Sequence, residues 1–137
     1  MIRRNKTLLP TSAELRILQA LWQLRQGTVE DIVKSFPAKD RPKYKTTQTF
    51  LRIMEGKKFV AHEVQGRVFV YTPLVEREEI NQLSVQNLLQ QNFAGSASGL
   101  MVNLLASHTV PQTDLDQLEE MIREYKNRKE SPARTRK

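Results

Sequence analysis

The 137-residue chain contains no cysteine, which excludes disulfide bonds, thiolate metal sites and a cysteine nucleophile. Histidine is also scarce, since His62 and His108 are the two present. A zinc site would have to take most of its ligands from carboxylates, which is an unusual ligand set for that ion. The sequence therefore predicts no metal and no other cofactor.

Long apolar runs are absent as well. No run approaches the roughly 18 residues that span a bilayer, and the basic start MIRRNKTLLP is not followed by the apolar stretch of a secretion signal. We therefore expect a cytoplasmic protein with no membrane insertion. No glycine-rich phosphate loop occurs, and neither histidine stands in a pattern typical of a nucleophile and its base. An enzyme is not expected.

Basic residues dominate the charge of the chain, with 22 Lys and Arg against 15 Asp and Glu. The resulting net charge of +7 is unevenly distributed, because residues 39–75 carry +5, residues 94–122 carry −4 and residues 123–137 carry +5. A strongly basic middle segment is typical of a nucleic-acid-binding face. The hydrophobic fraction of 39% indicates that most of the chain folds.

Hydrophobic spacing predicts two helices in the first part of the chain. Residues 12–25 repeat apolar side chains every three or four positions, and Thr11 with Glu14 forms a capping box at their start. Thr28 and Asp31 give a similar, weaker signal for a short second helix before a proline-containing polar turn.

The segment PKYKTTQTFLRIMEGKK, residues 42–58, predicts a third helix that begins near Lys45 and has a polar front. Gly56 suits a C-terminal cap with positive φ. Two runs rich in β-branched and aromatic residues follow at 59–64 and 67–74. Their two-residue, glycine-containing connection predicts a β-hairpin.

Three helices followed by a hairpin are the order of a winged helix-turn-helix domain, whose third helix enters the major groove of DNA. We expect this domain at residues 8–75 and a helical dimerisation domain at residues 76–126. Residues 127–137 are basic and lack apolar side chains, and they predict a disordered tail. The expected fold class is mainly α with a small β-hairpin.

The C-terminal helices have more leucine than one small domain needs. A second copy of the chain is the simplest partner for these side chains, and its two-fold symmetry would match a palindromic operator. The alternative is that they pack back on the N-terminal domain. The nearly all-apolar helix at 100–106 should be buried on most sides. The expected dimerisation residues are Ile80, Leu83, Leu88, Leu100, Leu104, Leu115, Leu118 and Ile122.

The polar front of the third helix is the predicted DNA-binding surface. Gln can bond an adenine edge and Thr offers a hydroxyl and a methyl to thymine, so Gln48 and Thr49 are expected to read the base sequence. The basic side chains around them are expected to contact phosphates. The expected DNA-binding residues are Lys43, Lys45, Thr46, Thr47, Gln48, Thr49, Arg52, Lys57 and Arg67.

Two other interpretations of this surface stay open. A run of basic residues on a helix is often no more than a solvated surface. The same face could also follow an A-form RNA backbone in an RNA-binding or ribosome-associated module. Aromatic side chains for base stacking would favour RNA, and Tyr44, Phe69 and Tyr71 are few. Double-stranded DNA is therefore the preferred partner.

Three segments carry a resemblance to a known family: ELRILQALW, KTTQTFLRIMEGKKFV and GRVFVYTP. With the glycine-broken helices after them, they resemble the BlaI/MecI family of penicillinase repressors, which includes the CopY copper-responsive repressors. The resemblance covers about residues 8–125 and implies a homodimeric transcriptional repressor that binds a palindromic operator. Copper sensing through the cysteine clusters of that branch is excluded, because the chain has no cysteine.

For the antibiotic-responsive members, the resemblance also implies induction by proteolysis. A membrane metalloprotease sensor is activated, and the repressor is cut after an Asn in a short apolar helix of the dimerisation segment. In GSASGLMVNLLAS that place is Asn103-Leu104, with Leu104 where the best-known members have Phe. A ligand-responsive repressor, with an effector between the helices at 80–106, is the alternative.

Overall fold

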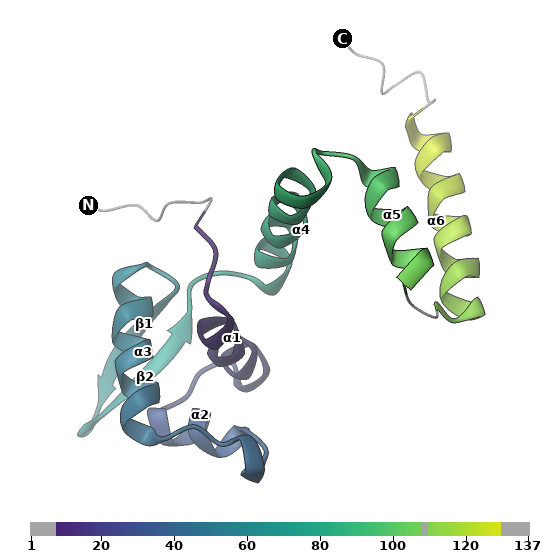
Figure 1. Cartoon of the computed structure of the whole chain (residues 1–137). Helices are drawn as coiled ribbons and strands as arrows, with labels where there is room; N and C mark the ends of the chain where they lie inside the picture. The colour runs from purple at the N-terminus through teal and green to yellow at the C-terminus, as the bar shows by residue number, and fades with distance from the viewer. Residues whose placement is uncertain (1–7, 108–109, 130–137) are drawn as a thin grey trace. The chain divides into compact units, whose positions relative to one another are not determined.

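The computed structural model describes residues 8–107 and 110–129, which form helices and one antiparallel hairpin (Figure 1). This confirms the expected fold class, mainly α with a small β-hairpin. The chain divides into two units, with the boundary between Leu88 and Leu89. None of the described helices is long and apolar enough to cross a membrane. In chain order the elements are α1 (Ser12–Leu24), α2 (Val29–Ser35), the 3-10 helix η1 (Ala38–Asp40), α3 (Tyr44–Gly56), β1 (Val60–Gln65), β2 (Val68–Pro73), α4 (Arg77–Phe93), α5 (Ala97–Ser107) and α6 (Gln112–Lys129).

Both predicted capping boxes form. The Glu14 N–H donates to the Thr11 hydroxyl at 3.2 Å, and the Thr11 N–H donates to the Glu14 carboxylate at 2.9 Å. The corresponding bonds between Thr28 and Asp31 measure 3.1 and 3.0 Å. Each box satisfies two amides that the first turn leaves without a helical partner. As a result, α1 and α2 begin where the sequence predicts.

The end of α3 differs from the prediction. Gly56 is the last helical residue, and the positive φ of the cap is found at Lys58, with φ 70°. Phe59 N–H donates to Met54 O at 2.9 Å and Lys58 N–H donates to Glu55 O at 3.1 Å, which are the two bonds of a Schellman motif. Phe59 and Met54 are both fully buried. The assignment of Gly56 as the cap is therefore wrong, because burial of this apolar pair sets where the helix ends.

β1 and β2 pair antiparallel along their whole lengths. The loop between them is Gly66-Arg67, one residue later than predicted, and Gly66 has φ 66°, a conformation that glycine adopts without strain. On the other edge of β2, Gly27 and Tyr71 exchange two N–H···O bonds of 3.0 and 2.8 Å. This bridge fixes the root of the hairpin to the loop between α1 and α2, and the hydrophobic pattern contains no signal for it.

The core of the first unit draws apolar side chains from α1, α2, α3, both strands and the start of α4. Fully burying one side chain of this size contributes about 1.5–3 kcal/mol. Trp22 Nε1 also donates to Val75 O at 2.8 Å and ties α1 to the segment after β2. The core residues are Ile17, Leu18, Leu21, Val29, Ile32, Phe36, Leu51, Met54, Phe59, Val60, Tyr71, Val75 and Ile80.

The position of Ile80 corrects its assignment to a dimerisation surface. Ile80 is 1% exposed and belongs to the core of the first unit, and Leu83 packs against that core. Ile80 is covered and Leu83 is partly covered within the chain itself, as the alternative interpretation of the leucines requires for this part of α4. The first unit accordingly reaches Leu88, beyond the predicted domain limit at residue 75.

The helices of the second unit are covered much less. No described residue of α5 or α6 is buried, and Val102 and Leu105 are 67% and 49% exposed. The expectation that the helix at 100–106 is buried on most sides is wrong for the single chain. The predicted glycine break lies at Ala94 and Gly95, which have positive φ.

α6 extends to Lys129, so residues 127–129 are helical and the prediction of disorder there is wrong. The first residues of the tail continue a helix that begins at Gln112. The remainder of the predicted tail and His108 lie outside the described residues.

Candidate nucleic-acid interface

α3 buries one side and exposes the other. Leu51 and Met54 are fully buried, whereas Lys45, Thr49 and Arg52 are exposed. Spacings of four and three residues place these three side chains on one face of the helix. The surface thus has the outward polar side chains that a groove-binding helix requires. The other expected residues that are exposed are Lys43, Thr46, Gln48 and Arg67.

Thr47 is the exception on α3. It is 1% exposed, and its hydroxyl donates to Lys43 O at 3.0 Å. The structure therefore corrects its inclusion among the DNA-binding residues. The helical period turns Thr47 toward Leu51 and the core, while Thr46 and Gln48 on either side remain exposed.

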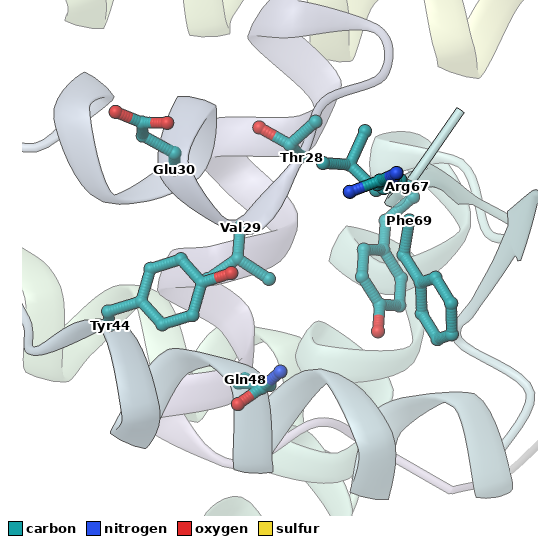
Figure 2. Close-up of a pocket in the computed structure, with 9 residues that line it drawn as sticks. Thr28, Val29, Glu30, Tyr44, Gln48, Arg67 and Phe69 are labelled. Atoms are coloured by element: carbon teal, nitrogen blue, oxygen red, sulfur yellow. The ribbon is translucent and has the colours of Figure 1, made fainter. Parts of the chain in front are cut away.

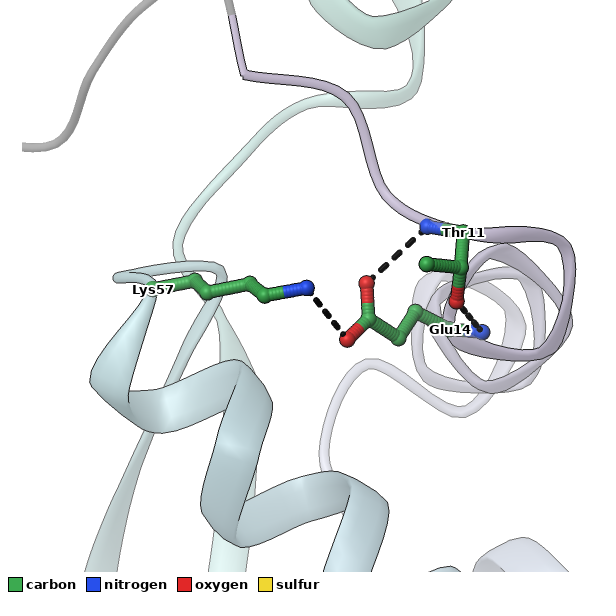
Figure 3. A network of polar contacts seen from close by, with 3 residues as sticks. All are labelled: Thr11, Glu14 and Lys57. Carbon is green, nitrogen blue, oxygen red and sulfur yellow. Dashed lines mark hydrogen bonds and ion pairs between the residues drawn. The ribbon is translucent and has the colours of Figure 1, made fainter.

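Lys57 has a partner inside the protein. Its Nζ lies 2.8 Å from Oε2 of Glu14, whose side chain is 2% exposed, and Figure 3 shows how this contact joins the capping box of α1. Burial of a carboxylate is costly unless a cation and hydrogen bonds compensate it. Lys57 therefore neutralises Glu14, and its expected role as a phosphate contact is corrected.

Arg41 is a second basic residue of the 39–75 segment that is used within the fold. Its guanidinium donates to Phe36 O at 3.0 Å and to Lys34 O at 3.2 Å. These bonds satisfy carbonyl groups at the end of α2 and hold the connection to α3. The number of basic side chains in this segment that are available to a ligand is therefore smaller than its net charge of +5 suggests.

A hollow lies between the start of α2, the front of α3 and the hairpin (Figure 2). Tyr44 and Gln48 line it from α3, and Arg67 and Phe69 line it from the hairpin. Gln48 and Arg67 were expected at a DNA interface, and the structure brings them to one concave surface. Tyr44 and Phe69, which are 52% and 45% exposed, were not among the expected DNA contacts. Tyr44 is exposed because it is the first residue of α3, and Phe69 is exposed because it lies in the outer part of β2, opposite Val64.

The face around this hollow is basic. Among the described residues, Lys43, Lys45, Arg52 and Arg67 have no ion-pair partner. Burial raises the pKa of the Tyr71 hydroxyl above its usual value, and the Glu55 carboxylate adds to the rise, so this phenol stays neutral at physiological pH. Unpaired cations on an exposed face attract a polyanion.

These features define the class of the first unit. Three helices, a two-stranded wing and an exposed basic face on the third helix make a winged helix-turn-helix domain. Within the described residues, no group of three or more His, Asp or Glu is arranged to hold a metal ion. The unit is therefore of a class known for binding nucleic acids.

The chain belongs to the penicillinase repressor family, whose model matches residues 10–124. It is 25% identical over 119 residues to the penicillinase repressor of Bacillus licheniformis, covering 87% of this chain and 93% of that protein. It is 21% identical over 118 residues to the methicillin resistance regulatory protein MecI of Staphylococcus aureus, covering 86% and 96%. Membership of a family of repressors confirms the expectation that the chain is not an enzyme.

Among solved structures, the chain is similar to the solution structure of the DNA binding domain of the repressor BlaI. The two are 26% identical and superpose with a TM-score of 0.48. The match covers 56% of this chain and 93% of that domain.

Proposed function

We propose that the chain is a cytoplasmic repressor that binds a palindromic DNA operator as a dimer. The observation that carries the proposal is the outer face of α3, where Lys45, Thr49 and Arg52 are exposed and, within the described residues, free of ion pairs. In the major groove, this face would present Gln48 and Thr49 to base edges. Arg67 in the hairpin loop would contact a phosphate. The family of repressors to which the chain belongs supports this proposal.

Binding to a duplex enriched from a randomised DNA library should weaken steeply as salt rises, because each neutralised phosphate releases counterions. Each phosphate contact contributes about 0.9 to the slope of log K against log salt. Arg52→Ala should lower the affinity and reduce that slope by about 1. Fluorescence anisotropy over a salt series measures both. A failure to enrich any duplex, or an affinity indifferent to salt, would contradict DNA binding.

The two neighbouring threonines give a matched control for base readout. Thr49→Val and Thr47→Val are the same change on the exposed and the buried side of α3. Thr49→Val should weaken DNA binding, because a hydroxyl facing the groove is lost. Thr47→Val should instead lower the free energy of unfolding by about 1 kcal/mol, because the bond to Lys43 O is lost.

RNA binding is the competing proposal, and the aromatic side chains argue against it. Phe69 is exposed, but its ring already stacks on His62 with 3.9 Å between the ring centroids. One face of this aromatic is therefore occupied and closed to a base. The same anisotropy assay with unlabelled single-stranded RNA as competitor distinguishes the two. Displacement by RNA at lower concentration than by duplex DNA would favour the RNA-binding module.

We propose that the helices of the second unit form the dimer surface. Val102, Leu105 and Ile122 are 67%, 49% and 54% exposed, although an apolar helix normally requires cover. A second copy of the chain supplies that cover with the two-fold symmetry of a palindrome. The expected residues that remain candidates for this surface are Leu83, which is partly exposed, and Leu88, Leu100, Leu104, Leu115, Leu118 and Ile122.

We also propose induction by cleavage at Asn103-Leu104 by a membrane metalloprotease sensor, as the family resemblance implies. Both residues are exposed in α5. A protease binds its substrate in extended form, so α5 must unwind, and in the single chain, where no residue of α5 is buried, this unwinding costs little. Mass spectrometry of the repressor from cells exposed to a penicillin should detect a fragment that ends at Asn103. Induction of the regulated genes while the chain stays intact would contradict cleavage.

A further inference from the structure

The outer half of the hairpin has fewer anchors than its root. At the root, Tyr71 exchanges two backbone hydrogen bonds with Gly27, and Leu74 N–H donates to Phe59 O at 2.8 Å. Farther out, every residue from Glu63 to Phe69 is exposed. The loop that carries the candidate phosphate contact therefore lies at the end of a projecting ribbon. Its position depends on what holds the middle of the hairpin.

His62 connects this ribbon to α3. Its Nδ1 lies 2.8 Å from both carboxylate oxygens of Glu55, a position from which an Nδ1–H would donate to the carboxylate. The imidazole stacks on Phe69 from the opposite strand, with 3.9 Å between centroids and 10° between ring planes. Tyr71 lies at the edge of the imidazole, with its ring centroid 5.6 Å from that of His62 and 6.2 Å from that of Phe69. We refer to Glu55, His62 and Phe69 as the wing clamp.

The clamp joins the two parts of the candidate interface. Glu55 lies on the turn of α3 that follows Arg52, and Phe69 lies two residues after Arg67 on β2. A continuous set of contacts thus runs from α3, through His62 on β1, to β2, the strand that follows the hairpin loop. Both side chains of the Glu55–His62 contact are about one-third exposed, at 34% for Glu55 and 27% for His62, so their contact lies at the edge of the surface and not in the core.

We propose that the wing clamp is a positioning device that sets the hairpin loop, and with it Arg67, at the spacing from α3 that DNA requires. This inference rests on the proposed DNA-binding function. It makes a prediction opposite to that of charge alone. Glu55 is an acidic group on a basic face, so its removal should strengthen attraction to DNA if it acts only through its charge. If Glu55 positions the wing, removing its acceptor oxygens should weaken binding.

Two substitutions of Glu55 separate these effects, because both remove the charge but one keeps an acceptor. E55Q retains an oxygen for His62 Nδ1–H and should bind a library-enriched duplex about twofold more tightly than the unaltered protein. E55A lacks that oxygen and should bind about three- to tenfold more weakly. His62→Ala breaks the same contact from the other side but keeps the Glu55 charge, so it should weaken binding at least as much as E55A. Fluorescence anisotropy gives the affinities, and thermal unfolding confirms that each variant is folded.

Arg67→Ala provides the second readout, in a double-mutant cycle. If the clamp acts through Arg67, this substitution should weaken binding less in the E55A background than in the unaltered protein. The free energies of unfolding should be additive, since Glu55 and Arg67 share no hydrogen bond or ion pair among the described residues. E55A binding as tightly as E55Q, or additive losses of affinity, would overturn the clamp alone. Failure of the unaltered protein to bind any duplex would overturn the proposed function and the clamp with it.

Discussion

Ile122→Asp is expected to convert a dimer into monomers and to weaken binding to a palindromic duplex by about a hundredfold or more. Ile122 is 54% exposed in the single chain, so the change removes little packing within one copy. In a dimer it would bury a carboxylate against apolar side chains, which is strongly unfavourable. Each remaining monomer would bind one half-site, without the gain in affinity that linkage of two sites provides. Light scattering after gel filtration measures the mass, and anisotropy measures the affinity.

The matched control for this experiment is Gln117→Asp, which adds the same charge at an exposed polar position of α6. It should leave both the mass and the affinity within about twofold of the unaltered protein. Thermal unfolding of the first unit should be the same in both variants, since neither residue belongs to its core. A monomeric mass for the unaltered protein at the concentration that saturates the duplex would contradict the proposed dimer.

Lys57→Met is expected to lower the free energy of unfolding by about 1–3 kcal/mol. The substitution keeps the aliphatic length but leaves the Glu14 carboxylate, 2% exposed, without its cation. The effect should be smaller than for a fully buried pair, because the Lys57 side chain is 31% exposed and water reaches it. Urea-induced unfolding measures the loss as a lower midpoint with an unchanged slope.

The double variant Glu14→Gln/Lys57→Met tests the origin of that loss. Glutamine at position 14 still accepts from the Thr11 N–H and completes the capping box, but it has no charge to neutralise. The double variant should therefore recover most of the stability that Lys57→Met loses. Lys45→Met, at an exposed position, should change the free energy of unfolding by less than about 0.5 kcal/mol. Equal losses in all three variants would contradict a specific role for the Glu14–Lys57 contact.

The elements of the first unit were predictable because their signals are local. Thr11 with Glu14, and Thr28 with Asp31, mark helix starts through bonds made within four residues of chain, and these bonds form as expected. The hairpin was recognised from two β-branched runs around Gly66, and its loop lies one residue later than predicted. The order of these elements was enough to predict a winged helix.

The errors arise where distant packing decides the outcome. Lys57 follows the polar front of α3 in sequence, yet its ammonium group pairs with the carboxylate of Glu14, 43 residues earlier in the chain. The cap of α3 falls on Lys58 because Phe59 must reach the core, although Gly56 is the better residue for a positive φ. Ile80 follows the helical spacing of the leucines predicted to form the dimer. This spacing shows that a side chain is apolar and on one face of a helix, but it does not show whether the same chain or a second copy covers it.

The way α4 completes the first unit has a consequence for how a cut repressor would be inactivated. Ile80 and Leu83 lie in α4, 23 and 20 residues before Asn103 in α5, so a fragment ending at Asn103 would retain the whole hydrophobic core of its DNA-binding unit. Such a product would remain folded and would keep its recognition surface. Under proteolytic induction, the repressor would thus leave the operator because the two copies of the chain separate. Each folded DNA-binding unit would then bind a single half-site too weakly to remain bound.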